Sequence, residues 1–417
     1  MKIVGIIAEY NPFHKGHEFH IEKAKKITGA DAAIIIMSGD YVQRGIPSIM
    51  PKHLRTQMAL ACGADVVLEL PVCYATGSAE YFATGAVSLL EALGCVDYLC
   101  FGSECGEIKI LQQIADVLCK ETELYKVLLQ KHLKNGNAFP AARKLAFIEY
   151  LGKNKSLSCI PEQISAILDS PNNILAIEYL KALSFLNSSI EPVTITREGA
   201  GYHDQTLGGL FSSASALRQG LQDCELTKNA NHTPAINHIL RELPQNCHKC
   251  FPVFADDFSL LLKAKLLTET KDTLTRYLDI TPEIANRIIT FRNDFLTFSQ
   301  FCDLIKTKNV TYSRISRCLI HILLGISKCD VPDLAADSRC GYARLLGFRQ
   351  ESSWVLTSIK KNTGIPVISK LSQPAGIDIH MLEQNIFASD LYESVVTDKY
   401  HTPYKNEYQK QIIRLKS

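Results

Sequence analysis

The sequence lacks three features that would reveal its class at once. Its net charge is only +2, from 45 basic and 43 acidic residues, so any nucleic-acid surface has to be a local patch. No apolar run is long enough to span a bilayer. The first residues contain neither a full secretory hydrophobic segment nor a small-residue cleavage site. We therefore expect a soluble, cytoplasmic protein with no membrane partner.

The fourteen cysteines form no strong metal-binding pattern. They are scattered, and many, such as Cys62 and Cys100, lie in apolar stretches, as expected of buried thiols in a reducing compartment. Cys247 and Cys250 form a CxxC pair, but no second CxxC or HxxxH motif lies at zinc-finger spacing. We therefore predict no tightly bound metal.

The first quarter of the chain alternates between two periodicities. Four continuous apolar segments are typical of buried strands: residues 2–8, 32–39, 65–71 and 96–104. Helical patterns separate them at residues 14–30, 51–64 and 78–94. This alternation indicates an α/β fold with a parallel sheet covered on both faces. Such a sheet binds its ligand beyond the carboxyl ends of its strands.

The pattern then becomes mostly helical to about residue 185, with a helix start at Ser170, Pro171 and Asn172. A further strand is predicted at the start of residues 191–204, ahead of a glycine-rich loop.

Beyond a loop-like region at residues 225–255, the pattern is entirely helical to about residue 328, and a small mixed α/β tail with a basic end follows. At 417 residues the chain suits two or three domains. We predict three, at residues 1–225, 226–330 and 331–417.

The turn after the first predicted strand carries an HxGH motif. Gly16 leaves the backbone open to a ligand where a helix N-terminus presents N–H groups that favour phosphate. His14, Lys15 and His17 add donors that can stabilise charge on a leaving pyrophosphate. A turn with one histidine is more often structural, but the position after the first strand of an α/β sheet favours a phosphate site.

A second motif, SASALR, runs from Ser213 to Arg218. Serine hydroxyls at a helix start, with an arginine one turn further on, form another potential anion cradle. Alone, this string would be an ordinary N-capped helix. Together with HxGH, it predicts that each motif supplies donors to one face of a triphosphate.

The two motifs resemble those of HIGH-type nucleotidyltransferases, which include class I aminoacyl-tRNA synthetases and adenylyltransferases. More specifically, the chain resembles the bacterial tRNA(Met) cytidine acetate ligase family. The motifs that carry this likeness are GIIAEYNPFHKGHEFHI, MSGDYVQRGIP, DVVLELP, FGSE, SPNNILAIEYLKAL, REGAGYHD and YSRISRCLIHILLGI. They extend over most of the chain.

The resemblance implies a HUP-like nucleotidyltransferase domain, a helical domain that binds tRNA, and a small basic tail. It also implies an ATP-dependent ligase that activates acetate as acetyl-adenylate and releases pyrophosphate. The acetyl group then passes to N4 of the wobble cytidine of elongator tRNA(Met), giving N4-acetylcytidine.

The resemblance further implies which residues act. The catalytic donors would be His14, Lys15, His17, Ser213 and Arg218. The ATP site would comprise Ile7, Ala8, Glu9, Tyr10, Asn11, Pro12, Phe13, His14, Lys15, Gly16, His17, Glu18, Phe19, His20, Gly102, Asn172 (or its neighbour Asn173) and Arg197. Asp40 stands where we expect asparagine in the family, and its carboxylate would repel a triphosphate unless magnesium lies between them.

The helical domain carries the predicted RNA surface. Arg314 and Arg317 share one face of a helix whose other side is apolar. Lys306 and Lys308 precede this helix, and Tyr312 is placed to stack on a base. A basic helical face is usually only solvated, so this prediction depends on the resemblance.

Two alternatives remain at this point. A small-molecule adenylyltransferase uses the same HxGH chemistry, but it needs little beyond the α/β unit, whereas this chain has a large second domain. A catalytically inactive RNA-binding protein is the other, and the intact His14, Gly16, His17 and Arg218 argue against it.

Overall fold

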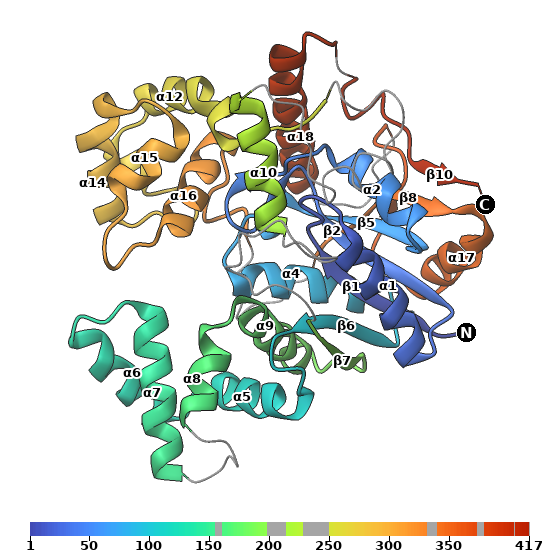
Figure 1. The fold of residues 1–417 in the computed structure, drawn as a ribbon, viewed down its shortest axis with the longest axis horizontal. Coiled ribbons are helices and arrows are strands. Elements are labelled where there is room, and N and C mark those ends of the chain that lie inside the picture. Colours follow the sequence, from blue (N-terminus) through green and yellow to red (C-terminus); the bar gives the residue numbers. More distant parts are fainter. Residues whose placement is uncertain are drawn as a thin grey trace.

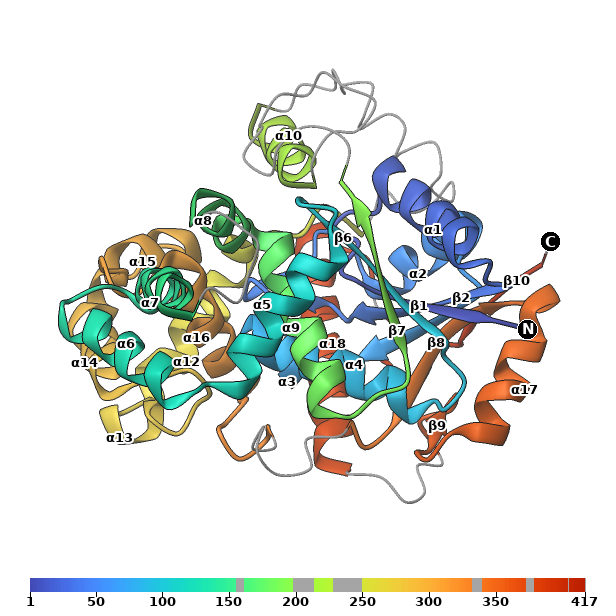
Figure 2. The ribbon, with the colours of Figure 1, turned by 90° about the horizontal axis from the view of Figure 1, so that it is seen from below.

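A central mixed sheet organises the molecule (Figures 1 and 2). The computed structural model describes residues 1–154, 161–197, 214–227, 250–331, 340–372, 379–403 and 405–416. The strands run in the order β10-β8-β5-β2-β1-β6-β7, with β9 beside β8. They are β1 (Ile3–Ala8), β2 (Ala32–Ser38), β5 (Val66–Leu70), β6 (Tyr98–Ser103), β7 (Glu191–Thr196), β8 (Ala343–Arg349), β9 (Val367–Ile368) and β10 (Ile413–Leu415). A separate hairpin joins β3 (Tyr41–Val42) to β4 (Ile46–Pro47).

The five N-terminal strands are mutually parallel, as predicted. Their order is that of a doubly wound sheet, in which the chain reverses its direction of travel between β1 and β6. The loop after β1 therefore opens into the crevice where such sheets bind ligands. This confirms the predicted α/β fold.

Helices cover both faces of the sheet because successive side chains of its buried strands point in opposite directions. On β2, Ile34 and Ile36 join one apolar core, which includes α4, α5 and α9. Ile35 and Met37 join the other core, beneath α1 and α2. These helices are α1 (Lys15–Thr28), α2 (Lys52–Ala61), α4 (Ala79–Ala92), α5 (Ile108–Lys120) and α9 (Pro171–Phe185); α3 (Val72–Ala75) is a single turn.

Between α5 and α9, a helical arm projects from the sheet (Figure 1). It consists of α6 (Glu123–Lys134), α7 (Phe139–Asn154) and α8 (Pro161–Asp169). The predicted helix start at residues 170–172 is confirmed, with Ser170 as N-cap and Pro171 in the first turn of α9. Helix α10 (Ala214–Thr227) lies near the ends of β6 and β7 (Figure 2).

The second helical region, yellow to orange in Figure 1, agrees with the all-helical pattern of its sequence. Its elements are η2 (Ala255–Phe258), α12 (Ser259–Thr268), α13 (Lys271–Leu274), α14 (Pro282–Phe291), η3 (Arg292–Asp294), α15 (Phe298–Ile305) and α16 (Tyr312–Leu324). The buried His321 joins this region to the sheet domain. Its two ring nitrogens lie 3.1 Å from the Leu278 carbonyl and 3.0 Å from the Thr76 carbonyl.

The C-terminal segment contributes strands to the central sheet. Strand β8 pairs antiparallel with β5, and β10 then pairs parallel with β8. Its helices are η4 (Gln350–Ser352), α17 (Ser353–Asn362) and α18 (Ile379–Tyr400). The predicted mixed α/β tail thus completes the sheet that the first residues begin. Among the described residues, no helix is both long and apolar enough to cross a membrane.

Candidate active site

The HxGH motif begins helix α1 at the switch point of the sheet. His14 is the N-cap residue, and its Nδ1 accepts a 3.0 Å hydrogen bond from the Gly16 N–H. Nδ1 of His17 accepts a 3.2 Å hydrogen bond from the His14 N–H, which completes a capping box. The two imidazole rings stack with their centroids 3.8 Å apart. The backbone of the motif therefore orients both rings.

These capping bonds also determine where each ring carries its proton. A nitrogen that accepts a hydrogen bond is unprotonated, so each neutral ring has its proton on Nε2. Burial, with the charges of Arg197 and Arg218, lowers the pKa of His14 to about 3. Burial and the adjacent His14 lower the pKa of His17 well below 6.5. Without an anion, the site therefore holds two neutral Nε2–H donors.

The residues around the motif support these rings. The Tyr10 ring contacts the rings of Phe13 and His17 edge-on, with both centroid distances 4.8 Å. Buried residues are Tyr10, Asn11, Pro12 and Phe13; half-buried ones are Ile7, Ala8, Glu9, His14, Gly16, His17, Glu18, Phe19 and His20; Lys15 is exposed. His20 Nε2 lies 3.7 Å from the Cys100 sulfur on β6, and burial lowers its pKa to about 4. His20 therefore packs at the edge of the segment.

Arg218 brings the second motif to the first. Its Nη1 donates a 2.7 Å hydrogen bond to the Asn11 carbonyl, and Nη2 donates a 3.0 Å bond to Ser215 Oγ. Burial and the nearby Arg44 lower its pKa to about 10, so Arg218 stays charged at neutral pH. Two arginines thus lie close enough to repel each other beside HxGH, an arrangement that favours an anion. Ser213 lies outside the described residues.

The other side of the crevice is built by Glu104, which the sequence did not single out. Its Oε1 accepts a 2.7 Å hydrogen bond from Asn172 Nδ2, and its Oε2 a 2.8 Å bond from the Asn173 N–H. These bonds hold the start of α9 beside the end of β6. The Asn172 side chain then accepts a 3.3 Å bond from the exposed Arg197. A Cβ on Gly102 would lie 3.2 Å from Arg197 Cγ, which explains the small residue there.

A second supporting residue absent from the prediction is Arg55 on α2. It is fully buried, and its guanidinium donates to the carbonyls of Glu9 (2.6 Å), Ser38 (3.0 Å) and Gly39. Its Nε donates a 3.0 Å bond to the Met50 carbonyl. The carbonyls of Glu9, Ser38 and Gly39 lie at the ends of β1 and β2, so Arg55 ties together the loops that form the base of the crevice. The local sequence HLRTQ gives no sign of these acceptors, which come from distant segments.

Asp40 is engaged within the protein. It is 3% exposed, and its Oδ1 accepts a 2.7 Å hydrogen bond from the Lys52 N–H at the start of α2. Lys52 Nζ and Arg55 Nη2 lie 3.9 and 4.0 Å from its carboxylate oxygens. These contacts explain the carboxylate by helix capping and charge pairing, so Asp40 does not fit a magnesium ligand. No group of three possible metal-binding side chains occurs among the described residues, which include Cys250 but exclude Cys247.

The predicted RNA-binding helix, α16, packs against the β3–β4 hairpin. Arg317 Nε donates a 2.9 Å hydrogen bond to Asp279, so this guanidinium has a partner within the helical region. Ser316 Oγ donates a 2.6 Å bond to the Gly45 carbonyl. Gly45 has φ +69°, and a Cβ there would lie 2.3 Å from the Arg317 nitrogen. Helix α16 thus fixes the position of the β3–β4 hairpin, which carries Arg44.

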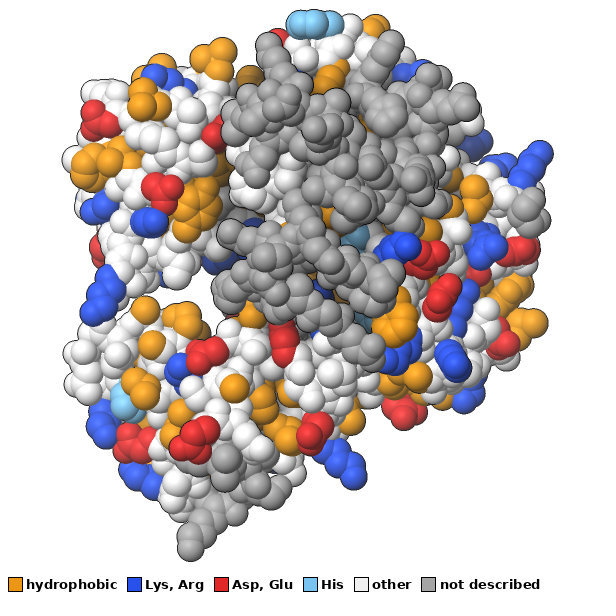
Figure 3. Space-filling model, viewed as in Figure 1, with side chains coloured by type: hydrophobic (Ala, Val, Ile, Leu, Met, Phe, Trp, Pro, Cys, Tyr) orange, Lys and Arg blue, Asp and Glu red, His pale blue; other side chains and the backbone are white. Residues whose placement is uncertain are grey.

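The other predicted RNA contacts differ in exposure. Lys306 and Lys308 are exposed, and Lys306 Nζ lies 2.6 Å from Asp303. Tyr312 and Arg314 are half-buried. On the face shown in Figure 3, basic side chains alternate with acidic ones and form no single large patch among the coloured residues.

Comparison with known proteins decides the family. A family model described as HIGH Nucleotidyl Transferase matches residues 1–408. Proteins named tRNA(Met) cytidine acetate ligase from Acetivibrio thermocellus and Clostridium kluyveri are 38% identical over 405 residues and 41% identical over 395 residues. Each alignment covers 94% of both proteins. The chain belongs to the tRNA(Met) cytidine acetate ligase family.

Solved structures agree with this family membership. A Thermotoga maritima TmcAL crystal structure with bound alpha-thio ATP has a TM-score of 0.88 to this chain, at 28% identity. Its apo form I has a TM-score of 0.90, also at 28% identity. Both comparisons cover 100% of both chains. The predicted resemblance and the predicted fold are confirmed over the full length.

Proposed function

We propose that this chain is an ATP-dependent ligase that joins acetate to N4 of the wobble cytidine in elongator tRNA(Met). The observation that carries the proposal is the HxGH capping box at the switch point. It presents two Nε2–H donors and a helix N-terminus beside the charged Arg218. The relatives named for this reaction match along nearly the whole chain, so the surrounding fold supports the same activity.

The first half-reaction makes acetate an electrophile. A carboxylate oxygen of acetate attacks the α-phosphorus of ATP, and pyrophosphate leaves as acetyl-adenylate forms. This displacement needs positioning and charge stabilisation rather than a dedicated acid–base pair. His14, Lys15 and His17 hold the departing phosphates, together with Ser213 and Arg218 of the second motif. As negative charge accumulates nearby, the anion favours the protonated imidazoles and so opposes the effect of burial.

The remaining proposed contacts position the nucleotide. Segment 7–20 binds ATP through its backbone and side chains, and Gly102, Asn172 and Arg197 complete the opposite wall of the crevice. Magnesium, if bound with ATP, would neutralise part of the triphosphate charge, and phosphate oxygens and water would be its main ligands, as is common for this ion. Asp40 is not required as a ligand because Lys52 and Arg55 already neutralise it.

The second half-reaction transfers the acetyl group to RNA. The N4 amine of cytidine attacks the acyl carbon, loses a proton and expels AMP. The base has to leave its stack to reach the adenylate. We propose RNA contacts at Lys306, Lys308, Tyr312, Arg314 and Arg317, with Arg317 also holding α16 through Asp279. Because its substrate is tRNA, we place the enzyme in the cytoplasm.

The decisive experiment incubates the protein with ATP, labelled acetate and bulk tRNA, followed by digestion of the RNA. N4-acetylcytidine that appears only with both ATP and tRNA supports the ligase. ATP consumption with a nucleotide-type acceptor and no need for acetate indicates the adenylyltransferase. Retained tRNA binding with no turnover indicates an inactive RNA-binding protein. Either of the last two results refutes the proposal.

A site variant tests the proposed chemistry separately. His17→Ala should abolish acetate-dependent ATP–pyrophosphate exchange and spare tRNA binding, because His17 belongs to the phosphate site and not to the helical region. Unchanged exchange would remove His17 from the mechanism.

A further inference from the structure

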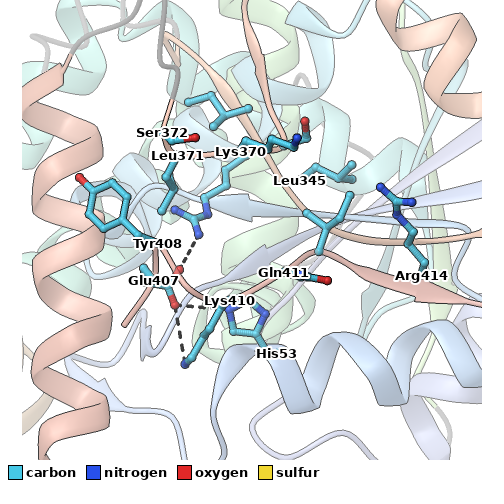
Figure 4. Close-up of a pocket in the computed structure, with 14 residues that line it drawn as sticks. His53, Leu345, Lys370, Leu371, Ser372, Glu407, Tyr408, Lys410, Gln411 and Arg414 are labelled. Carbon is cyan, nitrogen blue, oxygen red and sulfur yellow. Dashed lines mark hydrogen bonds and ion pairs between the residues drawn. The ribbon is translucent and has the colours of Figure 1, made fainter. Parts of the chain in front are cut away.

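A cavity lies beside strands β8, β9 and β10, which the C-terminal segment contributes to the sheet, and it is separate from the HxGH crevice. Its volume is about 620 Å³, within the range of small-molecule sites. Residues of β8, of the segment at β9 and of the chain leading into β10 line it (Figure 4). His53, in the first turn of α2, completes the lining. None of its lining residues belongs to segment 7–20 or is Gly102, Asn172, Arg197 or Arg218.

The acidic residue in this cavity is already neutralised. Glu407 Oε2 lies 2.5 Å from Arg344 Nη2 and 3.1 Å from Lys52 Nζ. Glu407 Oε1 lies 3.3 Å from His53 Nε2 and 3.8 Å from Lys410 Nζ. The charges of Lys52 and Arg344 and the hydrogen bond to His53 outweigh burial and lower the pKa of Glu407. The Glu407 carboxylate is therefore already paired with protein side chains, and it gives the cavity no preference for a cationic ligand.

The buried cluster around Glu407 balances its charges, whereas the rim of the cavity does not. The cluster pairs four cations with four carboxylates: Lys52, Arg55, Arg344 and Lys410 with Asp40, Glu69, Glu393 and Glu407. The exposed Lys370 and Arg414 also line the cavity, and no described carboxylate other than Glu407 does so. An entering ligand therefore meets an excess of positive charge.

One donor within the cavity wall lacks an acceptor. Arg344 is 6% exposed, and its Nε and Nη2 contact Glu69 and Glu407. Its Nη1 is buried and has no hydrogen-bond partner among the described residues. A buried donor on a charged group is costly when it stays unpaired. A ligand oxygen in the cavity would satisfy it after a small shift of the side chain.

We propose that this cavity binds a phosphate group, with Arg344, Lys370 and Arg414 as its donors. Guanidinium groups favour oxyanions with several acceptor oxygens, and phosphate matches their fork geometry. Leu345 and Leu371 add apolar walls that suit the organic part of a phosphate ester. The phosphate belongs either to a free nucleotide-sized molecule or to the RNA. The proposal is independent of acetyl transfer.

The position of the cavity connects it to the catalytic crevice through α2. His53 lines the cavity, and its neighbour Lys52 contacts both Glu407 and Glu69. Three residues after Lys52, Arg55 donates a hydrogen bond to the Glu9 carbonyl in the proposed ATP segment. A ligand that reorients Arg344 therefore acts on a charge cluster whose other end supports the base of the active site.

Calorimetric titration with inorganic tripolyphosphate tests the site in the full chain. The HxGH crevice also binds polyphosphate, so each titration is fitted with two sites, and the difference between the unmodified chain and the cavity variants isolates the second one. We expect one further binding event per chain, weakened about tenfold or more in the K370Q/R414Q double variant, which loses two charged donors. Lys361→Gln, an exposed charge on α17 outside the cavity, is the matched control and should bind as the unmodified protein does.

Arg344→Lys keeps a cation beside Glu69 and Glu407 but removes the forked donor, so it should weaken tripolyphosphate binding while the urea midpoint shows a folded chain. Absence of a second event, or unchanged binding in the double variant, overturns the proposal. Displacement of tripolyphosphate by tRNA, with weaker tRNA binding in K370Q/R414Q, assigns the phosphate to RNA. Tripolyphosphate binding that tRNA does not affect assigns it to a free molecule. Acetyl transfer is assayed separately, and its outcome is not used to judge whether the cavity binds phosphate or where that phosphate comes from.

Discussion

The HxGH histidines cap helix α1 and, in our proposal, donate hydrogen bonds to phosphate. These two roles can be separated by exchanging the histidines for residues that cap a helix equally well. Asparagine is among the best N-cap residues, and glutamine at the third helical position closes a capping box. His14→Asn and His17→Gln should therefore keep the bonds to the Gly16 and His14 N–H groups. Both variants remove the Nε2–H donors that we propose for phosphate.

The expected magnitudes follow from these contacts. Losing an N-cap hydrogen bond costs about 1 kcal/mol, so His14→Ala should lower the free energy of unfolding by that amount. His14→Asn should leave it within about 0.5 kcal/mol of the unmodified protein. Losing a donor to developing charge costs about 10²–10³ in rate. Acetate-dependent ATP–pyrophosphate exchange should therefore fall by that factor in His14→Asn and in His17→Gln alike.

Urea denaturation and the exchange assay, run on the same preparations, measure the two effects. Thr281→Ala is the matched control because Thr281 caps α14 in the helical region by accepting a bond from the Ile284 N–H. It should lose about 1 kcal/mol of stability and retain full exchange. If His14→Asn keeps both its stability and its exchange rate, the imidazole is only a cap and our account of the site is wrong.

Three further predictions concern the support of the site. Arg55→Lys should lower the free energy of unfolding by about 3 kcal/mol in urea titrations, because an ammonium cannot replace the buried fork; an unchanged midpoint would contradict this. Gly45→Ala combines a left-handed φ with a clash against the Arg317 backbone. It should cost more than about 1 kcal/mol and weaken ATP binding, and equal ATP affinity would show that the hairpin does not serve the site. Burial lowers the pKa of His20 to about 4, below the value of 6.5 for an exposed ring. Its contribution to stability is therefore complete above pH 6.5 and falls as the pH drops toward 4. Urea midpoints at pH 7 and 5 should show a smaller acid loss in His20→Asn than in the unmodified protein, and identical losses would refute the assignment.

The parts of the fold that local sequence patterns specify were predictable. The parallel strands β1, β2, β5 and β6 are continuous apolar runs because both of their faces are buried, and that signal does not depend on distant residues. The start of α1 was visible in the same way, since Gly16 and the two histidines are consecutive with the first strand. The helical pattern at residues 14–30 also agrees with the structure, in which α1 ends at Thr28 and Gly29 caps it with φ 64°.

The features that the sequence did not reveal are contacts between residues that lie far apart in the sequence. The pairing of β8 with β5 joins residues near 345 to residues near 68, and no local periodicity records which strands become neighbours. The roles of Arg55 and Glu104 were hidden because their hydrogen-bond partners come from distant segments of the chain. The pairing of Arg317 with Asp279 was hidden for the same reason, because the two residues are 38 positions apart in the sequence.

The order of the strands also has a consequence for the making of this protein. When a ribosome has synthesised residues 1–331, the HxGH segment, Arg55 and the second helical region already exist. The edge of β5 is still open, and Lys52 still lacks Glu407, because Arg344 and Glu407 come later. Open apolar edges invite association with other chains. The growing chain therefore carries its HxGH segment before its sheet is closed, and it stays prone to aggregation until strand β8 pairs with β5.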